Sequence, residues 1–424
     1  MFQPPRGTRD FFPEEMIKRE YVFNTVKAVF ERFGFLPTET PAFESWELLA
    51  KKGGGIKEEI YYFKDKGERE LSLRFDLTVP LARIIASNPQ IPKPFKRYQI
   101  GRVWRYDRPQ AGRFREFWQA DIDIIGSERT DADAECVAVG YESLKSLGLK
   151  DFIIKINNRK VLNGIMDVLD IENQTEVLRV LDKKEKIGEK DVEKELKELI
   201  GNKTKNLLKL IKTKGKLEDI IKQAKNRLEN SSLAVSGLEE LEELVSLSRV
   251  YGVKGLEIDF SLARGLDYYT GPIFEVVLKD KKESIAGGGR YDGLIESCGG
   301  RPTPAVGFSL GIERIYEAMI SKNLFRTPKT KTKVFVACVD DSVKKNVIEV
   351  SQKLRKEGVC VQTDVMGRDL KKQLEFADKN GIPFVILIGE EEVKQKLLTV
   401  KEMSKRTQTK ASIEKVIEIV KNKA

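Results

Sequence analysis

The sequence predicts an α+β protein of several domains, and three observations carry that prediction. Residues 95–126 read as a hairpin, because the returning segment Asp121–Ile125 alternates as a half-buried strand does. Residues 171–248 are rich in Lys, Glu and Leu, almost free of aromatic residues, and carry apolar residues at helical spacing. From Lys333 onward strands alternate with helices, which indicates a compact α/β unit of roughly one hundred residues.

The first half of the chain begins with a predicted helix over residues 12–33. Pro13 suits its first turn, the acidic residues after it complement the helix dipole, and Gly34 ends it. A short extended piece follows and ends at Pro41. The further elements expected before residue 150 are a strand at 71–74, a short helix at 80–87, the hairpin at 95–126 and a helix at 132–147.

The second half returns to strands after the Lys/Glu/Leu-rich segment. Strands are expected at 256–261 and 274–278, and a helix at 312–322, with glycine-rich pieces between them. Residues 324–332, LFRTPKTKT, read as a polar linker. Beyond the linker we predict strands at 334–339, 359–363 and 383–388, and helices ending near 357 and spanning 368–380.

Composition is that of a soluble globular protein, with 424 residues, 40% hydrophobic and 33% charged. No apolar run approaches the length that spans a bilayer, and the N-terminus lacks a signal-peptide core, so we expect no membrane partner. The four cysteines are scattered without a CxxC pair. This favours reduced thiols in a cytoplasmic protein over a disulfide framework or a cysteine zinc site.

The charge balance and one missing residue type restrict the function. The net charge of +10 favours a polyanionic partner such as nucleic acid, although lysine-rich surfaces also serve solubility. The chain contains no histidine, which excludes Ser-His-Asp triads, HExxH zinc sites and histidine phosphotransfer. Any catalysis must therefore use arginines, carboxylates, tyrosines, bound metal or the substrate itself. Whether the absence of histidine is selected or drift stays open.

The segment Arg105–Gly126, RYDRPQAGRFREFWQADIDIIG, is the most distinctive stretch. Four arginines alternate with acids, aromatics and a Pro-Gln-Ala-Gly turn, and the returning strand carries Asp121 and Asp123. This pattern predicts a phosphate clamp opening onto a pocket for a small cation. An ordinary solvated hairpin is the alternative, but three aromatic residues between the arginines favour function. The arginines are Arg105, Arg108, Arg113 and Arg115, and the aromatics are Phe114, Phe117 and Trp118.

Four separated pieces belong with this hairpin. They are RFDLT at 74–78, LARGLDYYTG at 262–271, AGGGRYDG at 286–293 and AVGFSLGIER at 305–314. The set resembles the histidyl-tRNA synthetases, a family of class II aminoacyl-tRNA synthetases. The resemblance covers essentially the whole chain, including the opening RGTRD at 6–10. RGLDYYTG together with GGGRYDG is highly specific for the family, whereas the glycine runs alone are weak signals.

The resemblance implies a fold and a domain organisation. It implies a six-stranded antiparallel sheet flanked by helices, and a homodimer whose interface is formed by the first motif, ending at Pro41. Residues 101–126 resemble the second motif and 305–314 the third. The implied domains are a catalytic core in two parts (1–170 and 249–325), a helical insertion (171–248) and an anticodon-binding domain (333–424). The insertion lies near the tRNA acceptor stem in the family, while its residues alone equally allow a solvated bundle without a partner.

The implied reaction joins histidine to the 3′ end of tRNA(His), with ATP and Mg²⁺ as cofactors. The carboxylate of histidine attacks the α-phosphate of ATP and pyrophosphate leaves, so fixed guanidinium groups can stabilise the transition state without a protein base. By family match, Arg105 clamps the α-phosphate, Arg113 contacts the nucleotide and Arg314 holds the γ-phosphate end. Arg264 occupies the place where other class II enzymes use an additional metal ion. The sequence identifies no metal ligands.

The resemblance also implies the residues that bind histidine. The α-amino group is assigned to Asp76, Thr78 and Gln119, the imidazole to Asp123 and Tyr269, and the pocket walls to Tyr268 and Tyr291. Many family members have glutamate at both acid positions, so the shorter aspartates leave the ligand distances open. Where bacterial members carry histidines in the second motif, this chain has Tyr106 and Trp118, which points to the archaeal–eukaryotic side of the family.

Two other protein classes share parts of this pattern. The regulatory subunit of ATP phosphoribosyltransferase keeps the catalytic fold as a binding module. Such proteins typically lack the C-terminal domain and the arginine of RGLDYY, both of which this chain retains. A class II synthetase for threonine, proline or glycine is the second alternative. The pairing of Asp123 with Tyr269 argues against it, because a polar pocket disfavours ligands that leave its groups unpaired.

Overall fold

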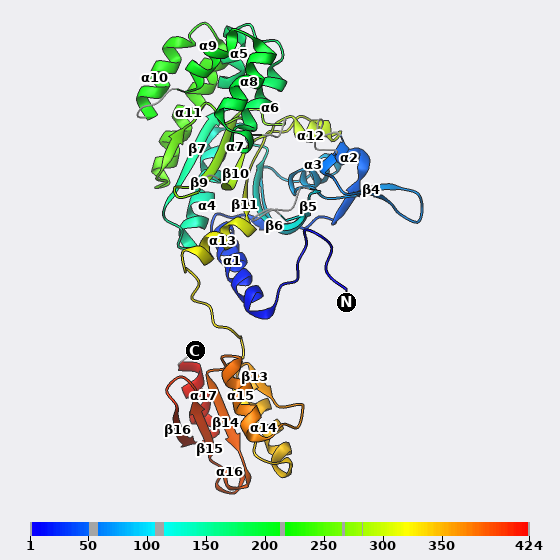
Figure 1. Cartoon of the computed structure of the whole chain (residues 1–424), viewed down its shortest axis with the longest axis vertical. Helices are drawn as coiled ribbons and strands as arrows, with labels where there is room; N and C mark the ends of the chain where they lie inside the picture. Colours follow the sequence, from blue (N-terminus) through cyan, green and yellow to red (C-terminus); the bar gives the residue numbers. More distant parts are fainter. Residues whose placement is uncertain are drawn as a thin grey trace. The chain divides into compact units, whose positions relative to one another are not determined.

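The computed structural model describes residues 2–50, 58–106, 114–212, 217–264, 268–281 and 283–422. The chain divides into two compact units, one made of residues 1–9 and 22–324, the other of residues 10–21 and 325–424. Figure 1 shows the large first unit built on one broad sheet, and the second unit as a smaller sheet with its own helices.

The first unit is built on an eight-stranded sheet. Its central six strands are antiparallel throughout, as the resemblance implied, and a short parallel strand is added at each edge. Long connections join both edge strands to their partners, as parallel pairing requires. In spatial order the strands are β1 (Leu36–Pro37), β5 (Phe95–Trp104), β6 (Glu116–Ile125), β11 (Ala305–Gly311), β10 (Ser284–Arg290), β9 (Pro272–Leu278), β7 (Phe152–Asn158) and β8 (Leu256–Ile258).

Helices cover this sheet where the sequence places apolar residues at helical spacing. The helix α1 (Pro13–Arg32) begins at Pro13 with acidic residues in its first turn, as predicted, and buries Val26 and Phe30. The helix α4 (Thr130–Ser146) packs on β11, and Gly140 allows the close approach, since a Cβ there would lie 2.5 Å from the Phe308 ring. The helix α13 (Ile312–Ser321) follows β11 directly.

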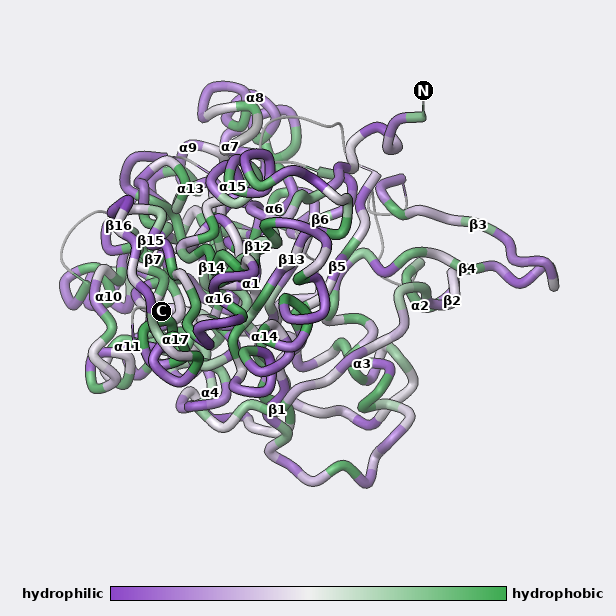
Figure 2. The backbone as a smooth tube through the Cα atoms, turned by 90° about the horizontal axis from the view of Figure 1, so that it is seen from below, coloured by the Kyte–Doolittle hydropathy of each residue, from purple (hydrophilic) through white to green (hydrophobic). Residues whose placement is uncertain are grey.

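A three-stranded sheet of the first unit precedes the site strands. It consists of β2 (Phe43–Ser45), β4 (Glu70–Leu73) and β3 (Tyr62–Lys64) in that order. The tip of the β3–β4 hairpin is hydrophilic and projects from the unit (Figure 2). The helices α2 (Trp46–Ala50), α3 (Thr78–Ser87) and α12 (Leu294–Ser297) contribute to one buried cluster that also contains Phe75 and Tyr291, which anchors two site segments in a common core.

The Lys/Glu/Leu-rich segment is helical. From residue 174 to 250 every regular element that the structure describes is a helix, and its buried residues form apolar stripes such as Leu238, Leu241 and Val245. Gly237 lets α11 approach α5, because a Cβ there would lie 3.0 Å from the Val161 backbone nitrogen. The helices are α5 (Arg159–Val168), α6 (Gln174–Asp182), α7 (Lys184–Ile187), α8 (Glu189–Ile200), α9 (Lys203–Ile211), α10 (Leu217–Arg227) and α11 (Ser232–Val250).

The second unit contains a five-stranded sheet in the order β13-β12-β14-β15-β16. The first three strands are parallel and alternate with helices, as predicted, whereas β15 and β16 form an antiparallel hairpin that was not predicted. The hairpin escaped prediction because β16 is exposed along most of its length and reads as polar. The strands are β12 (Val334–Cys338), β13 (Val361–Thr363), β14 (Phe384–Ile388), β15 (Leu398–Glu402) and β16 (Thr407–Ala411), and the helices are the short 3₁₀ helix η2 (Asp341–Val343), α14 (Lys344–Lys356), α15 (Leu370–Lys379), α16 (Glu390–Gln395) and α17 (Ile413–Asn422).

Candidate active site

Polar side chains line one face of the central strands of the large sheet. Alternate residues of a strand share a face, so Gln119, Asp121 and Asp123 of β6 project to the same side. The register pairs Asp123 with Arg97 and Asp121 with Gln99 on β5. All five side chains are buried, an arrangement whose desolvation cost calls for partners or a ligand.

The neighbouring strands supply glycines, which leave room above this face. Gly307 of β11 lies opposite Asp123, and a Cβ at Gly307 would run into the Asp123 carboxylate. A Cβ at Gly287 of β10 would overlap the Arg264 guanidinium, and one at Gly289 would lie 2.9 Å from the Tyr269 ring. The glycine-rich pieces that are weak signals by themselves are therefore strands whose bare backbone makes room for the side chains of Asp123, Arg264 and Tyr269.

Asp123 is held from two sides. The Arg97 Nη2 lies 2.7 Å from Asp123 Oδ2, and the Tyr291 hydroxyl donates a hydrogen bond to Asp123 Oδ1. Burial raises the pKa of Asp123 to about 6, although the Arg97 charge and the Tyr291 hydrogen bond act in the opposite direction. A carboxylate in this position is fixed in orientation and can accept a further hydrogen bond from a ligand.

The tyrosines and Asp76 lie beside this carboxylate. The Tyr268 ring centroid is 5.0 Å from that of Tyr269 and 5.9 Å from that of Tyr291, so the three rings form one wall. Asp76 Oδ1 accepts a hydrogen bond of 3.1 Å from the Val79 backbone nitrogen at the start of α3. Thr78, the first residue of α3, contributes a hydrogen bond to Tyr268.

Electrostatic interactions tie these groups together. The Asp76 charge acts on Tyr268, on Tyr269 and on both acids of β6. The structure thus gathers the predicted histidine-binding residues from four separated segments. They are Asp76, Thr78, Gln119, Asp123, Tyr268, Tyr269 and Tyr291.

Of the predicted phosphate-binding arginines, Arg105, Arg264 and Arg314 lie in the described part of the chain, each in a different setting. Arg105 continues the β5–β6 hairpin, donates from Nε to the Phe75 carbonyl oxygen at 3.2 Å, and stacks on the rings of Phe75 and Phe117. Arg264 donates from Nη1 to the Phe274 carbonyl oxygen at 2.7 Å. Its guanidinium lies 5.9 Å from the centroid of the Tyr269 ring.

The backbone at Arg264 is unusual. Its φ of 51° lies in the left-handed region, where a non-glycine residue is uncommon and is held only by its surroundings. Arg314 stands apart from the acids, in the first turn of α13, and donates to the Ser284 carbonyl oxygen at the start of β10. Arg113 and Arg108 lie outside the described residues.

Ser309, Arg97 and Asp121 were not singled out as ligands from the sequence. Ser309 Oγ accepts a hydrogen bond of 2.7 Å from Gln119 Nε2, and Arg97 pairs with Asp123, but only the strand register brings these partners together. Asp121 carried a signal, since the alternation Asp-Ile-Asp places two acids on one face. Burial raises the pKa of Asp121 to about 7. Within the part of the chain that the structure describes, no hydrogen-bond donor reaches Asp121 Oδ1 or Gln119 Oε1.

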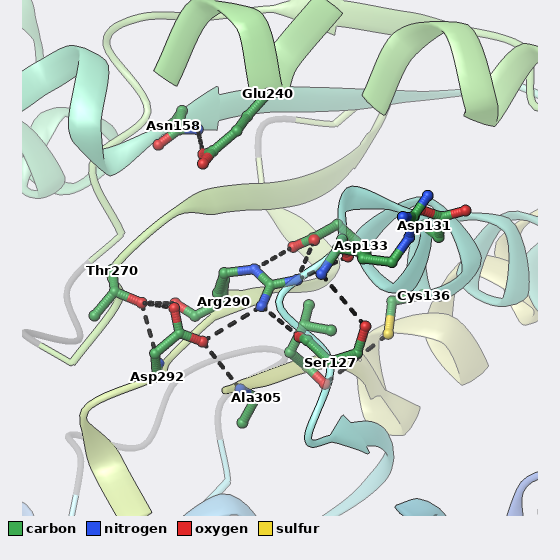
Figure 3. A network of polar contacts seen from close by, with 12 residues as sticks. Ser127, Asp131, Asp133, Cys136, Asn158, Glu240, Thr270, Arg290, Asp292 and Ala305 are labelled. Atoms are coloured by element: carbon green, nitrogen blue, oxygen red, sulfur yellow. Dashed lines mark hydrogen bonds and ion pairs between the residues drawn. The ribbon is translucent and has the colours of Figure 1, made fainter. Parts of the chain in front are cut away.

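A polar network around Arg290 and Asp292 holds the site segments in place (Figure 3). Arg290, at the end of β10, pairs with Asp133 of α4 and donates to the Ser127 carbonyl oxygen at 2.8 Å. Asp292 accepts from the Ala305 backbone nitrogen at 3.0 Å and from the Thr270 hydroxyl at 3.2 Å. Because Tyr291 lies between Arg290 and Asp292, and Tyr269 precedes Thr270, this network fixes the backbone of both pocket tyrosines.

The opening segment RGTRD contacts the hairpin and the third motif. Arg9 Nη2 lies 2.8 Å from Glu313 Oε2, and its guanidinium stacks on the Phe114 ring. The Arg115 backbone nitrogen donates to the Gly7 carbonyl oxygen at 2.8 Å. The segment therefore braces the strand that carries the site acids.

Asp121 leads to a prediction about stability. Its pKa of about 7 lies above the value near 3.9 of an unfolded aspartate, so the folded chain binds this proton more tightly. The contribution to stability is full at low pH and is lost as the pH rises from about 4 to about 7. Asparagine does not ionise, so Asp121→Asn should be free of this loss. Its free energy of unfolding should exceed that of the wild type by more at pH 8 than at pH 5, the difference being on the order of 2 kcal/mol.

Urea unfolding of the ligand-free protein at both pH values measures this difference. Asp131→Asn, an exposed carboxylate on α4, is the matched control and should show no such pH dependence. An equal effect of Asp121→Asn at pH 5 and pH 8 would mean that Asp121 is not perturbed in the folded chain.

The described residues offer no protein-built metal centre. They contain no group of three or more His, Cys, Asp or Glu side chains that could hold a metal ion. None of the helices in the described part is long and apolar enough to cross a membrane.

Comparisons with known proteins agree with this organisation. The family model described as Histidyl-tRNA synthetase matches residues 7–315, and that described as Anticodon binding domain matches residues 333–423. The chain is 38% identical over 429 residues to a histidine–tRNA ligase of Pyrococcus furiosus, covering 100% of this chain and 99% of the relative. It is 41% identical over 405 residues to the same enzyme of Aeropyrum pernix, covering 94% and 92%.

Solved structures give the same result. The crystal structure of histidyl-tRNA synthetase from Nostoc sp. PCC 7120 matches with a TM-score of 0.86 at 33% identity over 100% of both chains. A Bacillus halodurans structure titled as an ATP phosphoribosyltransferase regulatory subunit/histidyl-tRNA synthetase matches with a TM-score of 0.75 at 24% identity, covering 89% of this chain and 96% of that one. The latter likeness shows the fold alone.

An antiparallel sheet with arginines and acids on its pocket face, followed by an anticodon-binding domain, is the organisation of a class II aminoacyl-tRNA synthetase. Among such enzymes, this chain belongs to the histidyl-tRNA synthetase family.

Proposed function

We propose that this chain is a histidine–tRNA ligase that activates histidine with ATP and transfers it to the 3′ end of tRNA(His). The observation that carries the proposal is the pocket in which a fixed carboxylate, Asp123, lies among tyrosines, with Arg264 packed against Tyr269. Such a pocket provides acceptors for a ring with polar nitrogens and guanidinium charge beside them for an acyl phosphate. Family membership supplies the reaction class.

Histidine recognition rests on two sets of polar groups. Asp123 and Tyr269 bind the imidazole nitrogens, and Asp76, Thr78 and Gln119 bind the α-amino group. The Gln119 carbonyl oxygen supports this assignment, because it is buried and no donor among the described residues reaches it. Tyr268 and Tyr291 wall the ring, and Tyr291 also orients Asp123. Apolar rings would leave these buried groups unpaired, which disfavours them strongly.

Adenylate formation needs no protein base. The nucleophile, the carboxylate of histidine, is already an anion, and fixed charges stabilise the α-phosphate as pyrophosphate leaves. Arg105 and Arg264 serve this role, and their stacking and backbone hydrogen bonds hold them in position. In the second step, a phosphate oxygen of the adenylate accepts the proton of the tRNA hydroxyl. A chain without histidine is therefore chemically sufficient.

The ends of the nucleotide are assigned to two further arginines. Arg113 contacts the nucleotide, and Arg314 holds the γ-phosphate. Mg²⁺ enters this proposal as the counter-ion that ATP carries on its phosphates. The described residues do not form a metal centre, so we derive no catalytic step through the ion.

The regulatory reading is less well supported by the residues of this chain. Arg264 is present and held against the site, and residues 333–423 match an anticodon-binding model. A binding module that does not transfer an acyl group needs neither feature. The remaining parts of the proposal are a homodimer, a cytoplasmic location, and the boundaries 1–170, 171–248, 249–325 and 333–424 for the domains.

Aminoacylation tests the proposed function directly. The purified chain, given ATP, Mg²⁺ and radiolabelled histidine, should charge a tRNA(His) transcript and leave other tRNAs uncharged. ATP-dependent charging that is absent with histidine but present with threonine, proline or glycine would overturn the proposal in favour of another class II activity.

Removing the anticodon-binding segment should separate the two steps of the reaction. Deletion of 333–424 is expected to leave histidine-dependent pyrophosphate exchange measurable while strongly reducing tRNA charging. The reason is that the acids and arginines of the site all lie in the first unit, whereas residues 333–424 belong to the second unit. Persisting exchange is the internal control for folding. Charging by the truncated protein at the full-length rate would exclude an anticodon-binding role for this segment.

A further inference from the structure

The strand β11 carries one side chain where its neighbours on the pocket face are glycines. Alternate residues of a strand share a face, so Gly307, Ser309 and Gly311 lie on the side of the sheet that carries the acids of β6. Phe308 lies on the other side, against α4. Of these three pocket-side residues, Ser309 alone has a side chain, and the contacts proposed above for histidine and for ATP do not use it.

The Ser309 hydroxyl is the partner of a pocket amide. Gln119 lies opposite Gly311 in the register, and its long side chain reaches diagonally to Ser309. Ser309 Oγ accepts a hydrogen bond of 2.7 Å from Gln119 Nε2. The Gln119 side chain is buried, and within the described part of the chain no donor reaches its Oε1. This contact therefore engages the nitrogen of the amide and leaves its oxygen for a ligand.

The orientation of the amide decides which ligand it can bind. The amide oxygen only accepts hydrogen bonds, and the amide nitrogen only donates them. A ligand ammonium group has donors and no acceptor, so it binds the oxygen and gains nothing from the nitrogen. If the Gln119 amide were rotated by half a turn, it would oppose such a ligand with its own donors. The Ser309 contact thus prepares Gln119 for an ammonium group.

Asp121 favours the same orientation. It lies directly opposite Ser309 in the register of β6 and β11. Burial raises the pKa of Asp121, whereas a hydrogen bond from Ser309 acts to lower it. A hydroxyl that gives its one hydrogen to a carboxyl group is left as an acceptor toward its other neighbour. Ser309 therefore accepts from Gln119 Nε2 and does not donate to Gln119 Oε1.

We propose that Ser309 is a positioning residue, which holds the Gln119 amide with its oxygen toward the α-ammonium group of histidine and so sets the preference of the pocket for ligands with a free amino group. The inference rests on the proposed function, because it concerns the amino end of the same substrate. Ser309 acts through Gln119 and forms no contact of its own with the ligand in this role.

Ser309→Ala should raise the Kd for L-histidine about tenfold, because a buried donor of Gln119 loses its partner and the amide is free to rotate. The inhibition constant of imidazolepropionate, which is histidine without its amino group, should change by less than about twofold, since this ligand does not use the amide oxygen. Calorimetry of the full chain measures the Kd, and competition in histidine-dependent pyrophosphate exchange measures the inhibition constant.

Two further variants serve as controls. Ser321→Ala removes an exposed hydroxyl that donates to the Ala318 carbonyl oxygen at the end of α13, and it should leave both constants unchanged. Should Ser309→Ala fold poorly in thermal unfolding, Ser309→Cys keeps the volume with a much weaker hydrogen-bonding group, and the same two constants decide.

A double variant shows whether Ser309 acts through Gln119. Gln119→Ala should also weaken binding of L-histidine, and Ser309→Ala added to it should cause no further loss. Losses that multiply in the double variant would overturn the inference. An equal loss of affinity for imidazolepropionate in Ser309→Ala would also overturn it, because a general disturbance of the pocket affects both ligands.

Failure of this inference differs from failure of the proposed function. A wild type that binds histidine and supports exchange, with a Ser309→Ala variant that binds histidine equally well, would overturn the inference alone. A folded wild type that shows neither binding nor exchange with histidine would overturn the proposed function.

Discussion

Replacing Arg264 by alanine is expected to lower histidine-dependent pyrophosphate exchange by about 10²–10³-fold, the effect of removing one preorganised charge contact. Arg264 is held by the Phe274 carbonyl oxygen and the Tyr269 ring in a left-handed backbone conformation. Alanine keeps the Cβ and so leaves the conformational cost of this backbone unchanged, and the protein should fold. The loss should appear in kcat, with little change in the Kd for histidine, because the guanidinium acts on the phosphate as charge develops.

Two measurements show whether the loss of exchange comes from the missing guanidinium and not from a damaged protein. Thermal unfolding should show that the variant keeps its fold, and histidine binding by calorimetry should show that the amino-acid pocket persists. Arg69→Ala removes an exposed arginine of the β3–β4 hairpin that pairs with Asp65, and it serves as the matched control. Exchange by Arg264→Ala within a few-fold of the wild-type rate would exclude a catalytic role for this arginine.

Gly287→Ala should reduce exchange to a similar extent without removing any functional group. A Cβ at this position would overlap the Arg264 guanidinium and lie 2.7 Å from the Phe274 carbonyl oxygen, which is the acceptor that fixes Arg264. Because one of these obstacles is backbone, the arginine must move, and a displacement of about 1 Å is enough to cost on the order of 10²-fold in rate.

A double variant with Arg264→Ala shows whether Gly287 acts through the Arg264 guanidinium. Both substitutions act through the same guanidinium, so the double variant should be hardly slower than either single variant. Gly293→Ala is the control, since a Cβ there meets no atom within 4 Å among the described residues. Multiplying losses in the double variant would show that Gly287 acts by a route other than Arg264.

The sequence predicted the elements of the pocket better than its contacts. The alternation of Asp121–Ile125 placed two acids on one strand, and the resemblance assigned Asp76, Asp123 and Tyr269 to one ligand. Arg97 could not be predicted, because its pairing with Asp123 depends on the register of β5 against β6. The glycines of 286–293 are weak signals by themselves, and only their neighbours Arg264 and Tyr269 explain why a strand would lack side chains there.

The second unit shows a different limit of prediction. Buried strands such as VFVACV have a clear apolar pattern, so the parallel part of that sheet was foreseen. The hairpin β15–β16 has an exposed strand at the sheet edge, and an exposed strand carries no apolar signal that separates it from a loop. A strand can be predicted from the residues within it. The contacts between site residues cannot, because they join side chains that are far apart in the chain.

The central claim is that one pocket on this sheet activates histidine with ATP. ATP–pyrophosphate exchange by the full chain, measured with each of the twenty amino acids in turn and without tRNA, tests it most directly. Exchange that depends on histidine and is at background with threonine, proline and glycine is the predicted result. Exchange at background with histidine, from a folded protein that binds both histidine and ATP, would contradict the claim and favour the non-catalytic regulatory reading.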